Sequence, residues 1–282
     1  MQDKILFISD SNYVDYMSDV VFHGGRTILG ENFIDAKRIS FMYDDFVDFP
    51  NIYGRGFTLY GKLNSQLKID RDNLEEKIKD KYFKFIIYGS CLRNQDYLDS
   101  VKKHYKKDEV VFIDGEDHPF ISFNLTEFGL YFKRELDYNP KHILPIQFAI
   151  PEESIIKFKP EKTQNFGTVI PYEGRTYVFN DEESYFEDYA KSYFGVTCKK
   201  AGWDCLRHYE IMMNYCFPYF KGLEECPKMT MTKLPKKQII MAMRDLHNNC
   251  FNYYDEFMEE LMYILINKLT TKKIAEYVLN CL

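Results

Sequence analysis

The sequence has no long hydrophobic run, no surplus of positive charge and no paired-cysteine motif. None of its apolar runs approaches the roughly 18 residues that a membrane-spanning helix needs. Its 37 Lys and Arg residues against 43 Asp and Glu residues give a net charge of −6 over 282 residues. That balance argues against a broad nucleic-acid surface, which requires a basic face. We therefore expect neither a membrane span nor a nucleic-acid partner.

The seven cysteines lack the spacing of a disulfide framework, and none belongs to a Cys-x-x-Cys pair. Cys205 and His208, with further cysteines nearby, leave a zinc site open as one interpretation. Buried free thiols are the alternative. Met1 to Lys4 leads into a short strand instead of the long apolar core of a signal peptide. The expected setting is therefore a reducing, cytoplasmic compartment.

Apolar residues still make up 45% of the chain, enough for a sizeable core. In the first half, predicted strands alternate with predicted helices. The strands are expected at residues 4–9, 32–36, 85–88 and 110–113, and the helices at 15–29, 70–81 and 95–106. Such alternation predicts a parallel, doubly wound sheet. The expected fold class is α/β.

A highly charged segment at residues 152–164, which contains Pro160, separates the two halves of the chain. Such segments are typical of domain boundaries, so we expect domains at residues 1–151 and 152–282. The second half is expected to repeat the alternation before it ends in two helical segments. Its strands are predicted at 166–171, 194–198, 217–220 and, as a short edge strand, 229–233, with helices at 181–191 and 205–214.

Local residues mark the ends of some of these elements. Asp15 is predicted to cap the first helix and Gly30 to end it. Asn180 is the expected cap of the helix at 181–191. Residues 43–67 are expected to form a loop, with room for a hairpin. The pair Gly24-Gly25 either allows close packing or a kink, or lets the backbone approach a sugar.

Polar residues follow several strand ends in the first half: Asp10, Gly89-Ser90 and the run Asp114–His118. Ligands of parallel sheets bind beyond the carboxyl ends of the strands, so these residues are candidates for one cleft. Each also suits a turn, which is the alternative interpretation. Lys133-Arg134 follows in the chain and either meets a phosphate or balances the acidic run.

The stretch from Ser192 to Pro227 organises the second half as strand, basic turn, helix and strand. Lys199, Lys200 and Gly202 form the turn, and Asp204 is a plausible N-cap of the helix. A helix start attracts phosphate because its N–H groups are unpaired. Arg207 and Glu210 share one helix face at this spacing. They suit a phosphate and ribose hydroxyls, or form an ordinary surface ion pair.

About 35 residues of this stretch resemble the donor-binding segment of exostosin-type glycosyltransferases and, more loosely, of GT-B glycosyltransferases. The matching positions are Phe194-Gly195, Lys199-Lys200-x-Gly202, Arg207-x-x-Glu210 and Pro218. The chain departs from the family at Asn214-Tyr215-Cys216, where a glycine usually ends the helix. Asn tolerates the left-handed conformation best after Gly, so Asn214 is expected to end the helix here.

The resemblance implies two Rossmann-like domains in a GT-B-like arrangement, the second binding a sugar nucleotide and the first an acceptor. It implies a glycosyltransferase that moves a sugar from a nucleoside-diphosphate donor to a hydroxyl of a glycan or other acceptor. The donor-binding residues it implies are Lys199, Lys200, Gly202, Trp203, Asp204, Arg207 and Glu210. The candidates for a catalytic base are Asp10, Glu116, Asp117 and His118.

No metal cofactor is expected, because the cations of the basic turn and Arg207 can neutralise a diphosphate. One alternative is a metal-dependent, GT-A-like transferase that uses Asp114, Glu116 and Asp117 as ligands. Another is a non-catalytic module that binds a nucleotide or a glycan.

Overall fold

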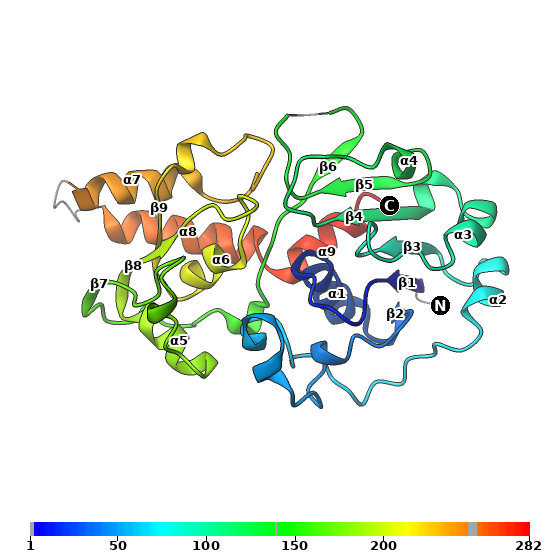
Figure 1. Cartoon of the computed structure of the whole chain (residues 1–282), viewed down its shortest axis with the longest axis horizontal. Coiled ribbons are helices and arrows are strands. Elements are labelled where there is room, and N and C mark those ends of the chain that lie inside the picture. Colours follow the sequence, from blue (N-terminus) through cyan, green and yellow to red (C-terminus); the bar gives the residue numbers. More distant parts are fainter. Residues whose placement is uncertain (1–2, 139, 248–252) are drawn as a thin grey trace.

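The computed structural model describes residues 3–138, 140–247 and 253–282 and contains two parallel β-sheets (Figure 1). The first sheet has the order β2-β1-β3-β4-β5-β6, with β1 (Ile5–Ile8), β2 (Phe33–Asp35), β3 (Phe85–Tyr88), β4 (Val110–Asp114), β5 (Leu130–Lys133) and β6 (Ile143–Pro145). The second has the order β7-β8-β9, with β7 (Gln164–Phe166), β8 (Ser192–Thr197) and β9 (Phe217–Phe220). The expected α/β class with parallel, Rossmann-like sheets is confirmed.

Helices connect and cover these strands. They are α1 (Tyr16–Leu29), α2 (Leu74–Lys79), α3 (Leu98–His104), α4 (Phe123–Thr126), α5 (Glu182–Ala190), α6 (Leu206–Met213), α7 (Lys236–His247), α8 (Tyr254–Lys268) and α9 (Thr271–Leu279). Short 3₁₀ turns include η3 (Phe49–Asn51) and η4 (Tyr53–Gly56). None of the helices in the described part of the chain is long and apolar enough to cross a membrane.

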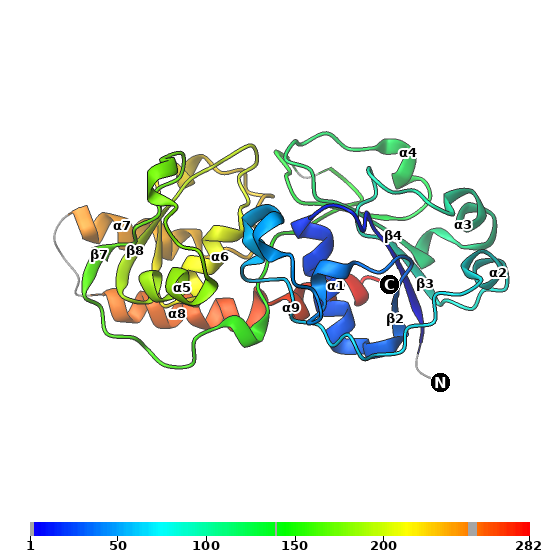
Figure 2. The same cartoon turned by 60° about the horizontal axis from the view of Figure 1, so that its bottom comes forward.

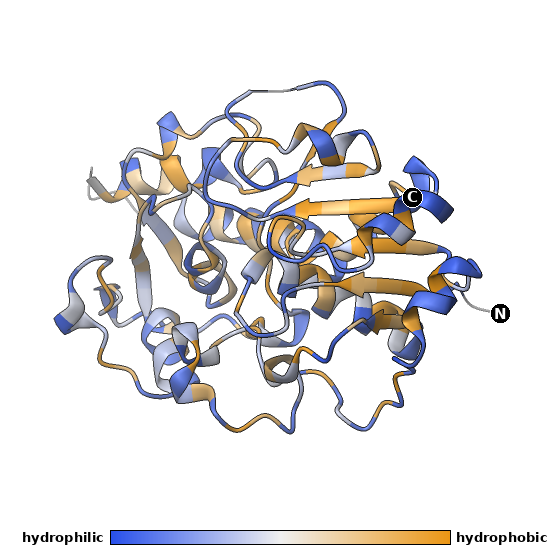
Figure 3. Cartoon of the chain, turned by 45° about the vertical axis from the view of Figure 1, so that its right-hand side comes forward, coloured by the Kyte–Doolittle hydropathy of each residue, from blue (hydrophilic) through white to orange (hydrophobic). Residues whose placement is uncertain are grey.

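The strands of the first sheet are hydrophobic along most of their length (Figure 3). This is the pattern of a parallel sheet that is covered on both faces. Alternate residues of β1 face opposite sides: Phe7 belongs to the core formed with α1 and α9, whereas Leu6 and Ile8 belong to the core formed with α2, α3 and α4. The predicted alternation of strands and helices thus gives a sheet with a packed core on each of its two faces.

Helix α1 begins at Asp15, whose carboxylate accepts a hydrogen bond from the Ser18 N–H at 3.2 Å. It ends at Gly30, which has a φ of 55°. Both predicted ends are therefore confirmed. A Cβ added at Gly24 would lie 2.0 Å from the carbonyl oxygen of Thr271, at the start of α9. Gly24 thus serves helix packing, and α9 lies against α1 (Figure 2). Gly25 instead allows the Phe33 ring of β2 to come close, since a Cβ there would lie 2.4 Å from this ring.

The chain crosses between the two sheets twice, and the crossings lie side by side. Ile150 leaves the first sheet, and Thr270 leads from α8 back to it. The Ile150 N–H donates to the Leu269 carbonyl at 3.2 Å, and the Thr271 N–H donates to the Ile150 carbonyl at 2.8 Å. As a result the last helix of the chain packs on the first sheet, although it follows the second sheet in sequence.

Several local predictions were wrong in detail. Asp181, not Asn180, caps α5, because its carboxylate accepts from the Ser184 N–H at 2.7 Å. Residues 229–233 form turns instead of an edge strand. Residues 43–67 form the expected loop, with short 3₁₀ turns and without the hairpin for which it had room. Asn214 is the C-cap of α6, as expected, but the left-handed residue is Tyr215, with a φ of 55°.

Replacing Gly24 by Ala should destabilise the protein, because the added methyl group meets a backbone carbonyl that cannot move aside alone. We expect Gly24→Ala to lower the free energy of unfolding by about 1–3 kcal/mol, the usual cost of overpacking. The measurement is urea denaturation. Gly174→Ala is the matched control, since a Cβ there meets nothing within 4 Å. Equal midpoints for the two variants would contradict the packing role of Gly24.

Candidate functional site

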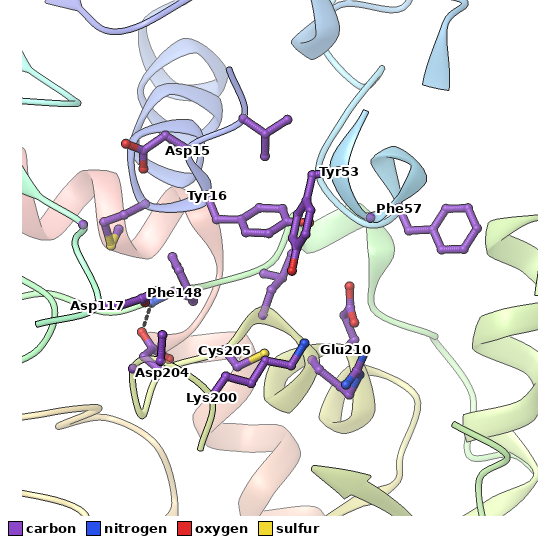
Figure 4. Close-up of a pocket in the computed structure, with 18 of the residues that line it drawn as sticks. Asp15, Tyr16, Tyr53, Phe57, Asp117, Phe148, Lys200, Asp204, Cys205 and Glu210 are labelled. Atoms are coloured by element: carbon purple, nitrogen blue, oxygen red, sulfur yellow. Dashed lines mark hydrogen bonds between the residues drawn. The ribbon is translucent and has the colours of Figure 1, made fainter. Parts of the chain in front are cut away.

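A cavity of about 800 Å³ lies between the two sheets and is lined by residues of both (Figure 4). The side of the first sheet contributes the start of α1, the η4 turn and the loops that follow β3, β4 and β5. The side of the second sheet contributes the β7–α5 loop, the turn after β8 and α6. The charged and phenolic groups of the lining include Asp15, Tyr16, Tyr53, Arg93, Asp117, Arg134, Tyr172, Tyr177, Tyr185, Lys200, Arg207 and Glu210. The cavity therefore opens where strands end, as parallel sheets favour.

The basic turn after β8 presses against the first half of the chain. A Cβ added at Gly202 would lie 2.6 Å from Glu135 Oε1 and 2.9 Å from Asp117 Oδ1, so a glycine is needed for this approach. Lys200 and Gly202 line the cavity. Lys199 and Trp203 lie outside the lining, and the Lys199 ammonium stands 4.8 Å from the centre of the Trp203 ring.

Asp204 joins the two halves and does not cap α6, contrary to the prediction. The N-cap of α6 is Cys205, which offers no side-chain hydrogen bond in the described structure. The Asp204 carboxylate accepts from the Phe148 N–H at 2.7 Å (Figure 4). It also accepts from the Tyr209 hydroxyl at 2.8 Å. Burial raises the pKa of Asp204 to about 6, against the lowering effect of Arg134.

Arg134 forms the centre of the same junction. Its side chain is 1% exposed, and it donates to the Asp204 carbonyl at 2.7 Å and to Glu135 Oε1 at 2.9 Å. It also pairs with Asp117. Lys133, its neighbour, pairs with the buried Asp114 at 2.8 Å. The Lys-Arg pair thus balances the acidic run, which is one of the two roles that the sequence allowed.

Arg207 and Glu210 both line the cavity but form no ion pair with each other among the described residues. The Arg207 guanidinium lies 5.3 Å from the centre of the Tyr177 ring. Its Nε and Nη1 atoms are buried, and neither has a hydrogen-bond partner in the part of the chain that the structure describes. A buried guanidinium with unused donors is costly unless a ligand satisfies it.

Glu210 is 7% exposed and is held from both halves of the chain. Its Oε1 accepts from the Thr58 hydroxyl and its Oε2 from the Tyr185 hydroxyl, both at 2.7 Å. Burial raises the pKa of this carboxyl, and the two hydrogen bonds act against that rise. The interpretation of Arg207 and Glu210 as a surface ion pair is therefore wrong.

The four candidates for a base occupy different places. Asp10 accepts from the Asn12 N–H at 3.0 Å in a tight turn, and Glu116 pairs with Arg93 at 2.9 Å. The His118 ring packs beside Phe120. These three candidates lie outside the cavity lining, whereas Asp117 belongs to it and faces Arg134.

The acidic run is not arranged as a set of metal ligands. Asp114 is 1% exposed and accepts from Lys133 and, at 2.6 Å, from the Tyr131 hydroxyl. Glu116 and Asp117 are paired with arginines instead of converging on a point. Residues 3–138, 140–247 and 253–282 hold no group of three or more His, Cys, Asp or Glu side chains placed to bind a metal ion.

His208, the histidine of the zinc interpretation, has partners at both of its ring nitrogens. His208 is buried, with Nδ1 2.9 Å from the Thr197 hydroxyl and Nε2 2.9 Å from the Trp203 carbonyl. Burial lowers the pKa of His208 to about 4, so the ring is neutral and has both nitrogens engaged. Cys205 lines the cavity, and burial raises the pKa of its thiol. Among the described cysteines, Cys91, Cys216 and Cys226 are buried free thiols, and Cys198, Cys205 and Cys281 are partly buried.

Sequence reasoning missed much of the lining on the side of the first sheet. Asp15 was predicted as a helix cap, yet the same carboxylate lines the cavity. Arg93 follows the Gly89-Ser90 turn after β3, and the strand-end rule that selected this turn also locates Arg93. Tyr53 and Tyr177 lie in loops among many other aromatic residues, and no pattern in the sequence distinguishes them.

Comparisons of the chain with protein-family models, curated proteins and solved structures found no match. The resemblance to exostosin-type glycosyltransferases therefore rests on the motif between Phe194 and Pro218 alone.

Asp204 should make stability depend on pH with a defined sign. Its pKa is about 6 in the folded protein against 3.8 as the reference value, so the folded state keeps a proton that the unfolded state releases. The stabilisation is complete below pH 3.8 and is lost as the pH rises to about 6. A rise of about two pKa units corresponds to roughly 3 kcal/mol. We expect the wild type to lose most of that unfolding free energy, relative to Asp204→Asn, between pH 4 and 6.5.

The measurement is urea denaturation of both proteins across this pH range. Asp181→Asn is the matched control, because hydrogen bonds from Ser184 lower the pKa of Asp181. The difference between wild type and that variant should change in the opposite direction. A difference between wild type and Asp204→Asn that is constant with pH would contradict the prediction.

Proposed function

We propose that this protein is a glycosyltransferase of GT-B-like arrangement that moves a sugar from a nucleoside-diphosphate donor to a hydroxyl group of a glycan or other acceptor. The observation that carries the proposal is the partly buried Arg207 side chain, whose buried Nε and Nη1 donors are unused within the described structure. Arg207 lies in the first turn of α6 and lines the same cavity as Lys200. Two cations at a helix start form a site for a diphosphate.

The start of α6 adds to this site. The N-cap Cys205 makes no side-chain cap hydrogen bond in the described structure, and of the first-turn N–H groups that of His208 donates to the Cys205 carbonyl at 3.0 Å. The N–H groups at the very start of the helix are therefore the ones that an anion can use. Negative charge grows on the diphosphate as the glycosidic bond breaks. Lys200, Arg207 and these N–H groups are aimed at that charge, which is how a fixed polar site lowers the barrier of a reaction.

Glu210 is assigned to the ribose of the donor. A carboxylate has about four acceptor positions, and Thr58 and Tyr185 use two of those of Glu210. The remaining positions suit neutral hydroxyl groups. Glu210 lines the cavity one turn after Arg207, so a ribose next to a bound diphosphate lies within reach of the same helix.

The acceptor is assigned to the side of the first sheet, where aromatic rings line the cavity. Tyr53 is 68% exposed, and its ring centre lies 5.9 Å from that of Tyr16. Exposed aromatic faces at a cavity offer apolar contact area with a polar tip, which suits a sugar ring. No metal enters this scheme, because the positive charge comes from side chains and the helix start.

A nucleoside diphosphate should stabilise the folded protein even in the presence of EDTA. We expect UDP, GDP, CDP or dTDP at millimolar concentration to raise the melting temperature. A gain of roughly 2.7 kcal/mol corresponds to a concentration of 100 times Kd. Arg207→Ala should abolish the shift. Arg175→Ala is the matched control, since the Arg175 side chain is 87% exposed.

If no diphosphate of the four stabilises the wild type, the donor site does not exist as proposed. A shift that requires magnesium or manganese would favour the GT-A-like alternative. Binding without turnover would favour a non-catalytic nucleotide-binding module.

Arg207 and Glu210 should affect the kinetics differently. Glu210→Gln should mainly raise the donor KM, by roughly 10- to 150-fold, because a hydrogen bond to a charged group contributes about 1.5–3 kcal/mol in ground state and transition state alike. Arg207→Ala should also lower kcat, and Arg207→Lys should restore it in part, since an ammonium cannot make a two-pronged contact.

The measurement is steady-state kinetics on folded variants. Glu187→Gln is the control, because Glu187 pairs with Lys191 on the exposed surface of α5. Wild-type KM and kcat in both the Arg207 and the Glu210 variants would refute the assignment of these residues.

A further inference from the structure

We propose that the Asp15 carboxylate is the base that accepts the proton of the attacking hydroxyl group. The inference rests on the proposed function and goes beyond it by naming the catalytic residue. Asp15 lies between β1 and α1 and lines the cavity. It occupies the opposite side of the cavity from Cys205 and Lys200 at the start of α6 (Figure 4). A base on this side would face the acceptor, and the proposed diphosphate site lies on the opposite side of the cavity.

The other carboxylates of the lining are committed to different contacts. Asp117 pairs with the buried Arg134, and Asp204 accepts two hydrogen bonds at the junction of the halves. Glu210 is held by Thr58 and Tyr185 on the same helix as Arg207. Asp15 is the lining carboxylate that combines a place on the acceptor side with freedom from a short ion pair.

The contacts of Asp15 orient its carboxylate without neutralising it. Oδ1 accepts from the Ser18 N–H at 3.2 Å, which fixes the side chain at the helix start. Oδ2 lies 3.8 Å from Arg93 Nη1, beyond hydrogen-bond distance, and the Nε of the same arginine is bonded to Glu116 at 2.9 Å. Arg93 is therefore hydrogen-bonded to Glu116 and not to Asp15, and the Asp15 carboxylate remains able to accept a proton.

The groups that face Asp15 tune its affinity for a proton. Burial raises the pKa of Asp15, while Arg93, the Ser18 N–H and the Ser90 hydroxyl lower it and Glu116 raises it again. Asp19, one turn further along α1, is itself buried with a pKa well above its usual range, and it accepts from the Asp15 N–H at 3.1 Å. A carboxyl with a raised pKa is better matched to a proton transfer near neutral pH than an exposed one.

The acceptor oxygen forms a bond to the anomeric carbon of the donor, and its proton moves to a carboxylate oxygen of Asp15. The bond between the anomeric carbon and the phosphate oxygen breaks, and its electron pair leaves with the diphosphate. Asp15 returns the proton to solvent. Since base and leaving-group site occupy opposite sides of the cavity, attack comes from the face opposite the leaving group, and the anomeric configuration is inverted.

The test uses Asp15→Asn, because Asn caps helices about as well as Asp and the fold is preserved. Asp181→Asn is the matched control, since Asp181 caps α5 in the same way but lies at the surface. The donors are UDP-glucose, UDP-N-acetylglucosamine, GDP-mannose and dTDP-rhamnose. The acceptors are p-nitrophenyl glycosides and water. Readouts are kcat, donor KM, the pH profile, the anomeric configuration of the product and UDP or GDP binding by calorimetry.

We expect Asp15→Asn to lower kcat by about 10²- to 10⁴-fold, the usual contribution of a general base. Donor KM and nucleotide binding should stay within about twofold of wild type, and the acid limb of the pH profile should disappear. If Asp15→Asn fails to fold, Asp15→Ser, another capping residue, replaces it. The product of the wild type should have the inverted configuration.

The role of Asp15 is overturned if the folded Asp15→Asn variant has the kcat of the wild type, or if the product keeps the anomeric configuration of the donor. If the wild type still binds UDP or GDP in that case, the proposed function stands. A wild type that binds UDP or GDP but transfers to no acceptor, water included, is a binding module, and the role of Asp15 falls with catalysis. A wild type that binds neither nucleotide overturns the proposed function itself.

Discussion

The buried Arg134 guanidinium is the interaction on which the arrangement of the two halves depends. It belongs to the first sheet, yet it bonds the Asp204 carbonyl at the entrance to α6 while pairing with Glu135 and Asp117. A buried charge is tolerated only when its hydrogen bonds are satisfied, so removing one partner strands the others. The Asp204 carboxylate in turn accepts hydrogen bonds from the Phe148 N–H, on the side of the first sheet, and from the Tyr209 hydroxyl of α6. These contacts hold the two walls of the cavity together.

The same network explains why Arg207 stands out. Around the cavity, Arg134 is balanced by acids, Lys133 by Asp114 and Arg93 by Glu116. The ion pairs of the described residues leave Arg207 and Lys200 without an acidic partner. In a chain with a net charge of −6, two cations that form no ion pair among the described residues line one cavity, with the Glu210 carboxylate near Arg207. Cations placed in this way suit an anionic ligand.

The sequence was informative where a local rule decides the structure. Short apolar runs located β1 to β4, β8 and β9, and capping chemistry located both ends of α1. The prediction was wrong at Asp204, a residue type that suits an N-cap. Its carboxylate instead accepts a hydrogen bond from the N–H of Phe148, 56 positions earlier in the chain. The return of α9 to the first sheet has no local signal either, apart from Gly24. Lys200, Arg207 and Glu210 lie within eleven residues of one another, so a local pattern could predict them as a group. Tyr53 and Tyr177 reach the cavity only through contacts between distant segments, which no local pattern predicts.

Two helices begin at the cavity, and they differ in how their first turns are satisfied. Asp15 caps α1 with its own carboxylate, so the N–H groups there already hold a negative charge that belongs to the protein. Helix α6 begins at Cys205, which provides no such group in the described structure. The first helix start therefore holds an internal carboxylate, whereas the second has no such charge of its own at its N-cap. In the proposed transfer between a hydroxyl and a diphosphate, the first would supply the proton acceptor and the second would hold the anion, on opposite walls of one cavity.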